Sequence, residues 1–316
     1  MNGRLAVVAA ARGGWFGRSD AIEAGYSDAE IAQRVRAGRW TRLCRGAYAE
    51  ADAGVWSMPP WEREAWMHTR VAKAYFRRLN GRAVISHQSA LVLHGLEISD
   101  LDLRRVHLTN LSGPGRSGRR VCQHVAEPPI SAVVSIGEVQ LTSGPRAVIE
   151  TIHSTSYPVA VSVVDAALRE RLATADELFE SVRLFGRRRG VLAAARAVAF
   201  GDGLSESVGE SRMRVLLADL GLPEPTLQAV ITDRSGGFVA RVDFLLAAYG
   251  VVVEFDGTGK YAGREALVAE KLREDRIREL GYEVVRATWS DLSSPTAFAT
   301  RLHRAIDRAT PSWSRY

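Results

Sequence analysis

The sequence is poor in cysteine and has no long apolar run. Its 316 residues include only two cysteines, Cys44 and Cys122. Two cysteines are too few for a disulfide framework or a cysteine-based zinc cluster. The longest apolar run, Phe244–Val253, is too short to cross a membrane. The apolar segment Leu5–Ala11 is stopped by Arg12, so we interpret it as a first structural element and not as a signal core. We therefore expect a cytoplasmic protein with no membrane partner.

Lysine is also scarce, because it occurs only at Lys73, Lys260 and Lys271. Arginine therefore supplies nearly all of the basic charge, which leaves a net charge of +6 and a pI of about 9.6. This balance favours an anionic partner such as nucleic acid, although charge alone does not establish one. The length is enough for two or three domains of ordinary globular composition.

Capping signals near the start of the chain indicate two short helices followed by a hairpin. Ser27 and Glu30 have the spacing of a capping box, and Gly38 is placed to end the helix that they begin. Residues on either side of Arg45-Gly46 have the alternating pattern of strands, and Arg45-Gly46 is a turn signal, so a β-hairpin is predicted here. The predicted elements are helices over 20–24 and 28–37 and strands over 40–43 and 47–49. This order is that of a winged helix-turn-helix.

Polar and basic side chains of this first part are candidates for DNA contacts. Those expected to enter a major groove are Gln33, Arg34, Arg36 and Arg39. Arg42 and Arg45 on the wing are expected to contact phosphates. Three-helix units with a hairpin also serve as protein-binding modules, so that alternative stays open.

The middle of the chain, after Pro59-Pro60, mixes helical and extended patterns. Helices are predicted over 61–78, 86–93, 146–153, 159–171, 175–185 and 191–200, and strands over 106–111, 121–125 and 139–142. His87 and His94 are assigned to capping or packing, because no acid or third histidine has metal-ligand spacing to them. Gly201-Asp202-Gly203 is the predicted boundary of the last domain.

In the last domain, carboxylates border two apolar stretches that flank Gly250. A hairpin there would place Asp243 and Glu254 at the same end of two adjacent strands, with Asp256 on the face of Glu254. Buried strands rarely carry acids unless the acids are paired or bind a metal. Three converging carboxylates predict a Mg²⁺ (or Mn²⁺) site of the kind that hydrolyses phosphodiesters. The alternative is a solvated hairpin end with a turn at Asp256-Gly257.

Further elements surround these strands. The pattern predicts helices over 207–220, 265–280 and 298–309 and strands over 227–232 and 282–287. A strand, helix and strand at this spacing imply a parallel pair, and hence a small mixed sheet flanked by helices. Glu210 on the first of these helices is either the capping partner of Ser207 or an acid that leans toward the core.

The last third of the chain resembles the PD-(D/E)xK nuclease superfamily. Within that superfamily it looks most like uncharacterised domains related to Vsr-like endonucleases. The matching residues are Glu210, Asp243, Val-Val-Val-Glu254-Phe-Asp256-Gly257, Lys271-x-Arg273-x-Asp275 and Gly281-Tyr282-x-Val-Val-Arg286. The resemblance implies that Asp243 and Glu254 bind the metal, that Asp256 joins them or positions a water, and that Glu210 is a supporting acid. The superfamily has lysine where this chain has Asp256, so Lys260 or Lys271 would have to supply the catalytic cation.

The first part resembles the winged-helix domain of AbiEi-type antitoxins from type IV toxin–antitoxin systems. The matching residues are Ala24-Gly25-Tyr26-Ser27 and Arg36-Ala-Gly38-Arg39-Trp40-Thr41-Arg42-Leu43-x-Arg45-Gly46-x-Tyr48. Ser86–Ala90 with Leu93–Leu96 extends the likeness into the middle region. The resemblance implies binding to promoter DNA and a cognate toxin as protein partner.

These patterns predict an α/β protein (α+β overall) with three domains. They are a winged helix-turn-helix over 1–58, a mixed α/β AbiEi-like middle domain over 59–200 and a restriction-endonuclease-like α/β sheet domain over 204–316. The predicted function is DNA binding with Mg²⁺-dependent hydrolysis of DNA phosphodiesters, in a defence or toxin–antitoxin context. The alternative is a non-enzymatic AbiEi-like repressor or antitoxin whose nuclease fold is degenerate.

Overall fold

The chain divides into two compact units, which we describe separately. The computed structural model describes residues 1–51, 53–111, 113, 115, 117–126, 128–257 and 264–309. Unit 1 contains Met1–Ser154 and Leu172–Val191, and unit 2 contains Thr155–Arg171 and Leu192–Tyr316. Both mix helices and strands, which confirms the predicted fold class. The predicted division into 1–58, 59–200 and 204–316 differs from these units and stays a prediction. Within the described ranges, no helix has the length and apolar character needed to span a membrane.

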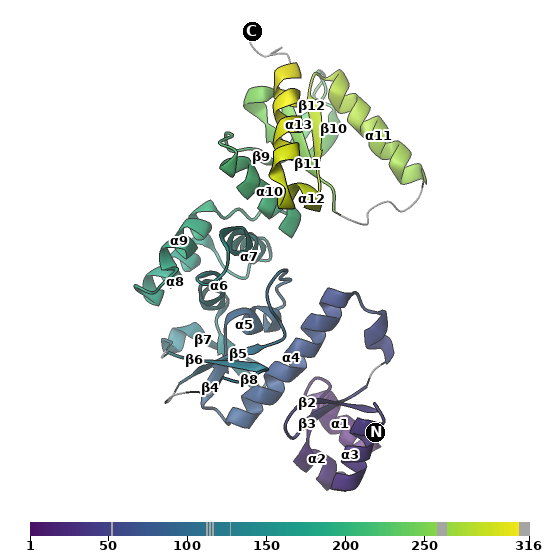
Figure 1. The fold of residues 1–316 in the computed structure, drawn as a ribbon, viewed down its shortest axis with the longest axis vertical. Helices are drawn as coiled ribbons and strands as arrows, with labels where there is room; N and C mark the ends of the chain where they lie inside the picture. The colour runs from purple at the N-terminus through teal and green to yellow at the C-terminus, as the bar shows by residue number, and fades with distance from the viewer. Residues whose placement is uncertain are drawn as a thin grey trace. The chain divides into compact units, whose positions relative to one another are not determined.

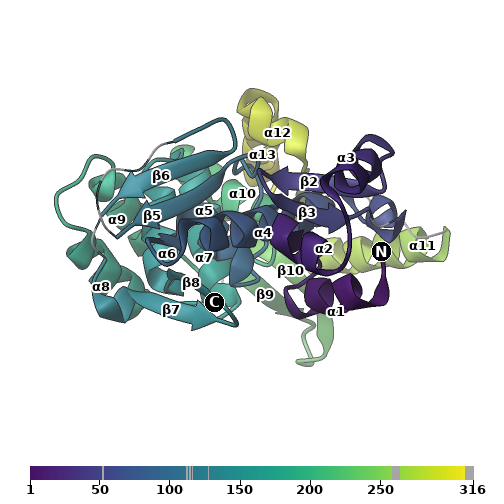
Figure 2. The same cartoon turned by 90° about the horizontal axis from the view of Figure 1, so that it is seen from below.

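Unit 1 begins with three helices grouped about a small sheet (Figure 2). The elements are α1 (Gly3–Ala11), β1 (Phe16–Gly17), α2 (Arg18–Glu23), α3 (Asp28–Arg36), β2 (Trp40–Cys44) and β3 (Ala47–Glu50). The strand order is β1-β3-β2, and β2 and β3 form the predicted antiparallel hairpin. The predicted capping box of Ser27 and Glu30 is present at the start of α3. The buried Trp40 ring packs edge-on against Phe16 and Tyr26, which fixes the hairpin to the helices.

The rest of unit 1 is a five-stranded mixed sheet with helices. After the short helix η1 (Ala53–Ser57), its elements are α4 (Pro60–Leu79), β4 (Ala83–Ile85), α5 (His87–Leu93), β5 (Val106–Asn110), β6 (Val121–Val125), η2 (Ile130–Ala132), β7 (Val133–Ile136), β8 (Val139–Thr142), α6 (Gly144–Ile152) and α8 (Ala175–Phe185). The strand order is β6-β5-β4-β8-β7. The strands β5 and β6 are parallel, so alternate residues of both point to the same face. The strands β4 and β7 were not among the predicted elements.

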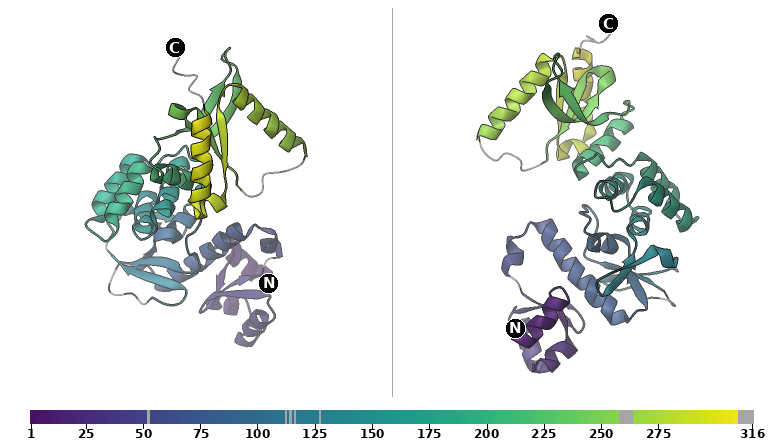
Figure 3. Two further views of the ribbon diagram at one scale, coloured as in Figure 1. Left: turned by 45° about the horizontal axis from the view of Figure 1, so that its top comes forward. Right: turned by 180° about the vertical axis from the view of Figure 1, so that it is seen from behind.

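Unit 2 contains a four-stranded sheet between two helical layers. Its elements are α7 (Tyr157–Arg169), α9 (Val191–Phe200), α10 (Val208–Asp219), β9 (Thr226–Thr232), β10 (Phe238–Leu246), η3 (Ala247–Tyr249), β11 (Val251–Phe255), α11 (Arg264–Glu279), β12 (Glu283–Ala287), α12 (Trp289–Ser293) and α13 (Pro295–Arg308). The strand order is β12-β11-β10-β9. Figures 1 and 3 show α11 and α13 on opposite sides of the sheet. Apolar residues of α10 and α13 pack on one face, and Ile277 of α11 packs on the other.

The strand register brings the predicted acids to one end of the sheet. The strands β10 and β11 are antiparallel with Phe244 opposite Val253, so Asp243 and Glu254 are the next pair along. The chain turns at Gly250, whose φ of +62° is a conformation that suits glycine. The strands β11 and β12 are parallel, as predicted, and Arg286 lies beside Glu254. The predicted hairpin geometry is therefore confirmed.

Candidate nucleic-acid interface and carboxylate cluster

The helix α3 and the hairpin β2–β3 present most of the predicted DNA-binding side chains to solvent. Gln33 and Arg36 on α3 are exposed. Arg34 differs, because its guanidinium lies 4.8 Å from the centre of the Tyr26 ring and 5.4 Å from that of Trp40. Stacking of arginine on aromatic rings stabilises the fold of this part of the chain. Arg34 is therefore half-buried and is less available to DNA than its neighbours.

Four arginines of this surface are exposed and make no ion pair with any acid in the described part of the chain. They are Arg36, Arg39, Arg42 and Arg45, which we call the winged-helix arginines. They lie at the end of α3, in the turn before β2, on β2 and in the turn between β2 and β3. Because no internal acid neutralises them, they are free to neutralise the phosphates of an external nucleic acid.

The acids at the start of α3 are already engaged. Asp28 pairs with Arg18, and the hydrogen bond from Arg18 lowers the pKa of the Asp28 carboxyl. Glu30 accepts hydrogen bonds from the backbone and the hydroxyl of Ser27, which lower its pKa. Each acid therefore has a local partner of its own. The basic character of the surface comes from the winged-helix arginines.

In unit 2, Glu210 is buried at the start of α10 and fully hydrogen-bonded. It accepts from the Glu206 amide at 2.8 Å, from Ser207 Oγ at 2.8 Å and from Gln228 Nε2 at 3.0 Å. Burial raises the pKa of the Glu210 carboxyl, and the Asp243 carboxylate raises it further. Glu210 therefore combines the two roles considered for it from the sequence. It is the capping partner of Ser207, and it also lies close enough to Asp243 to interact with it.

Glu210 lies near the strands because the backbone of α10 comes very close to the Phe255 ring. A Cβ atom on the preceding residue, Gly209, would lie 2.0 Å from the Phe255 ring, so only glycine fits there. This contact lets the first turn of α10 approach the end of β11. Gln228 of β9, which holds Glu210, has a φ of +49°, an uncommon conformation for a residue other than glycine. Such local strain concentrates at functional sites.

The carboxylates of the two central strands have partners within the protein. Asp243 Oδ2 accepts a hydrogen bond of 2.8 Å from the Phe255 amide. Glu254 is buried, and its two oxygens lie 2.9 and 3.0 Å from the two terminal nitrogens of Arg273. Burial raises the pKa of Glu254, and Arg273 opposes that shift. Asp256 is half-exposed and pairs with Arg286 at 3.2 Å.

Arginines therefore neutralise two of the three predicted metal-binding carboxylates, those of Glu254 and Asp256. Arg286 also binds Glu270 at 2.7 Å and Glu274 at 2.9 Å, so β12 and α11 share one ion-pair network. Arg273 binds Glu270 as well as Glu254. We call this group the unit 2 arginine network. It explains how buried acids are tolerated beside an apolar sheet.

Of the two predicted catalytic lysines, only Lys271 lies in the described part of the chain. Lys260 lies outside the described residues. Lys271 is exposed on α11. Since successive residues turn about 100° around a helix, Lys271 lies about 200° from Arg273, which faces Glu254. A catalytic role for either lysine stays an untested prediction.

Among the described residues, a histidine group, and not the carboxylates, has metal-ligand geometry. His87, His107 and His124 place one ligand atom each within 4.8 Å of one another. Asp243, Glu254 and Asp256 do not form such a group in the described ranges, so magnesium binding stays a prediction. His94 Nε2 donates a hydrogen bond of 2.9 Å to the Thr142 carbonyl oxygen.

The sequence analysis missed the histidine group because its members come from three separate elements. His87 begins α5, His107 lies on β5 and His124 on β6. The register of β5 and β6 puts His107 opposite Cys122, two residues from His124, and so brings both rings to one face. Burial lowers the pKa of His107 and of His124 to about 4, and it lowers that of His87 as well.

Comparison with known proteins supports the interpretation of the first part. Residues 4–51 match the family model described as "Transcriptional regulator, AbiEi antitoxin". Two proteins of Mycobacterium tuberculosis, named "Uncharacterized protein MT2308" and "Uncharacterized protein Rv2248", are each 29% identical over 233 residues, which are 73% of this chain and 84% of theirs. The crystal structure of RV2827C protein from Mycobacterium tuberculosis covers 66% of this chain and 78% of that one, with 12% identity and a TM-score of 0.41. The family match ends before α4, and it supports a DNA-binding regulator for the winged-helix part.

Proposed function

We propose that this protein is a transcriptional regulator of the AbiEi antitoxin type, which binds promoter DNA through its winged helix. The observation that carries this proposal is the set of four exposed winged-helix arginines without an internal acid. The match of residues 4–51 to a family of antitoxin regulators supports it independently. The net charge of +6 is consistent with an anionic partner.

The positions of the side chains on α3 and on the wing divide them into base contacts and phosphate contacts. Helix α3 is the second helix of the helix-turn-helix, and Gln33 and Arg36 lie on its exposed side. In this motif the second helix enters the major groove, where glutamine and arginine read base edges. Arg42 and Arg45 on the wing and Arg39 before it then contact the phosphate backbone. A cognate toxin is the protein partner that the antitoxin type implies.

Binding to the DNA upstream of the protein's own gene tests the proposal. We expect the full chain to bind this DNA more tightly than a scrambled duplex of equal length at physiological salt. Arg36→Ala should weaken specific binding about tenfold, since one base-contacting arginine contributes about 1–3 kcal/mol. The matched control is Arg304→Ala on α13, which removes another exposed arginine, in unit 2. Equal losses in both variants, or equal affinity for both duplexes, would contradict the proposal.

A second candidate function is metal-dependent hydrolysis of DNA in unit 2. Three carboxylates at one end of the sheet favour it, because burial and the nearby Asp243 carboxylate raise the pKa of both Glu210 and Glu254. The order α10, β9, β10, β11, α11, β12 is also the order that the resemblance to PD-(D/E)xK nucleases implies. Mg²⁺ or Mn²⁺ would bind here only if Arg273 released Glu254.

Nicking of supercoiled plasmid in Mg²⁺ or Mn²⁺ separates the two candidates. The nuclease hypothesis predicts nicking by the wild type and none by Asp243→Ala. Asp233→Ala is a suitable control, because Asp233 is an exposed acid that caps the turn between β9 and β10. No nicking by the wild type, together with specific promoter binding, would leave the regulator alone.

A further inference from the structure

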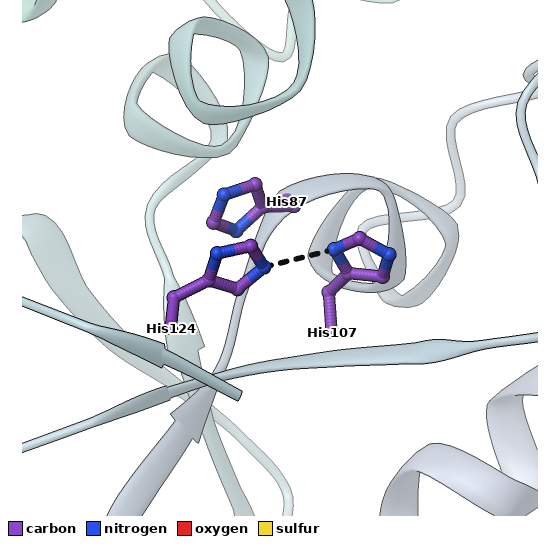
Figure 4. Close-up of side chains that lie close together, drawn as sticks. All are labelled: His87, His107 and His124. Atoms are coloured by element: carbon purple, nitrogen blue, oxygen red, sulfur yellow. Dashed lines mark hydrogen bonds between the residues drawn. The ribbon is translucent and has the colours of Figure 1, made fainter. Parts of the chain in front are cut away.

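Three histidines of unit 1, none of which belongs to the winged-helix surface or to the carboxylate cluster, converge at one face of the mixed sheet. Figure 4 shows the His124 ring next to both the His87 ring and the His107 ring. His107 Nδ1 and His124 Nε2 are 3.0 Å apart, and the ring centres of His87 and His124 are 3.7 Å apart. One ligand atom from each ring lies within 4.8 Å of the other two. Three of the seven histidines in the sequence therefore meet at one point.

The surroundings of the group resemble the outer shell of a metal site. Glu150 Oε2 lies 3.8 Å from His87 Nδ1, and Ser86 Oγ lies 3.0 Å from the same nitrogen. Glu150 is itself fixed by Arg146 at 2.9 Å and by the Thr142 hydroxyl at 3.0 Å. Metal-binding histidines commonly place their second nitrogen against a carboxylate or another oxygen, which orients the ring.

Two more contacts hold the rings in place. Gln88 Nε2 lies 3.0 Å from His107 Nε2, on the opposite side of the ring from His124. As it stands, the amide nitrogen donates to Nε2, so that Nδ1 carries the proton and donates it to His124 Nε2. A flip of the Gln88 amide would place its oxygen against Nε2, keep a proton there and leave Nδ1 free for a metal. His87 has a φ of +55°, and its amide donates to Glu150 Oε2 at 3.3 Å. A left-handed residue other than glycine at the start of a helix is uncommon and marks a position under constraint.

We propose that His87, His107 and His124 form a binding site for a divalent transition-metal ion, Zn²⁺ in the first place. Three imidazoles suit Zn²⁺, whereas Mg²⁺ and Ca²⁺ prefer oxygen ligands. Ligands of a tetrahedral zinc ion lie about 2.0–2.1 Å from the metal, and two of them are then about 3.3 Å apart. The 3.0 Å separation of His107 Nδ1 and His124 Nε2 is close to this value.

Binding requires one local movement and the loss of the proton that His107 Nδ1 and His124 Nε2 share in their hydrogen bond. The lone pair of an imidazole lies in the plane of its ring, and the planes of His87 and His124 are inclined by only 15°. The His87 ring must therefore turn out of the stack to direct a nitrogen at the same ion. Three histidine ligands leave a fourth position for water or another ligand. The ion would link α5 to β5 and β6 and so stabilise unit 1.

The test is zinc uptake by the full chain with no affinity tag. Protein treated with a chelator and dialysed is titrated with ZnCl₂ in a calorimeter, and its melting temperature is measured with and without zinc. We expect one Zn²⁺ per chain and a higher melting temperature, and no uptake of Mg²⁺ at this site. His107→Gln and His124→Gln should each weaken zinc binding at least tenfold.

The matched control is His303→Gln, because His303 is exposed on α13 and contacts only the Ala299 carbonyl oxygen of its own helix. It should bind zinc as the wild type does. If the cluster variants fail to fold, X-ray absorption of the zinc-loaded wild type decides, and it should show several imidazole nitrogens. No zinc uptake by the wild type, equal uptake by the cluster variants, or an oxygen-only coordination shell would overturn the proposal. None of these outcomes depends on DNA binding.

Discussion

The two arginine-rich regions of this protein use the same side chain in opposite ways. The winged-helix arginines are exposed and have no acidic partner in the described part of the chain. In the unit 2 arginine network, Arg273 and Arg286 are each shared among acids of β11 and α11. The difference shows that arginine content alone does not locate a nucleic-acid interface. What matters is whether the charge is already neutralised within the fold.

The comparison also separates the two candidate functions. A surface whose cations are free can bind phosphates without rearrangement. The carboxylates of unit 2 can bind a metal only after an arginine leaves, because Glu254 contacts both terminal nitrogens of Arg273. The structure therefore favours DNA binding by the winged helix over hydrolysis by unit 2.

The largest effect is expected from breaking the network at its buried acid. Glu254→Ala removes the partner of Arg273 in a mostly buried position and should lower the free energy of unfolding of unit 2 by about 3 kcal/mol. The control is Glu206→Ala, since Glu206 pairs with Arg241 at the surface and should contribute less than about 1 kcal/mol. Urea unfolding followed by tryptophan fluorescence measures both. Equal losses would show that the network has no special stabilising role.

An intermediate effect is expected within the winged helix. Arg34→Ala removes the stacking on Tyr26 and Trp40 and should lower the stability of unit 1 by about 1 kcal/mol. Arg36 is exposed and is not stacked on these rings, so Arg36→Ala should leave the free energy of unfolding within about 0.5 kcal/mol of the wild-type value. Thermal melting distinguishes them. If Arg36→Ala were the more destabilising, the division between stacked and free arginines would be wrong.

The smallest effect, and one of opposite sign, is expected at Glu210. Its pKa is raised in the folded state, so the ionised carboxylate costs stability at neutral pH, and that cost disappears as the pH falls below about 4.5. Glu210→Gln should therefore stabilise unit 2 by about 0.5–1 kcal/mol at pH 7 and by less at pH 4.5. Unfolding at the two pH values measures this. A gain that grows on acidification would contradict the cause that we assign to the shift.

The sequence was sufficient for most of the elements but not for the roles of single side chains. Alternation around Gly250 and the spacing of α11 predicted the hairpin, the parallel pair and the shared end of Asp243 and Glu254. The sequence does not show how α11 is rotated about its own axis. In the structure, Arg273 and not Lys271 faces the acids. Which face a helix turns to a sheet depends on tertiary packing, which no local pattern encodes.

The histidine group illustrates the same limit. His107 and His124 lie on strands whose pairing is long-range, and β4, which lies between β5 and β8, was not predicted at all. Without the strand order, His87 had no visible partner. A pair of histidines on two predicted strands was the only signal available, and it became informative once the register was known.

The salt dependence of promoter binding tests the central claim most directly. Each phosphate neutralised by an arginine adds about 0.9 to the slope of log K against log salt concentration. The account predicts that Arg39→Ala with Arg42→Ala lowers this slope by about 2 relative to the wild type, whereas Arg304→Ala leaves it unchanged. An unchanged slope in the double variant would contradict the assignment of these arginines to DNA.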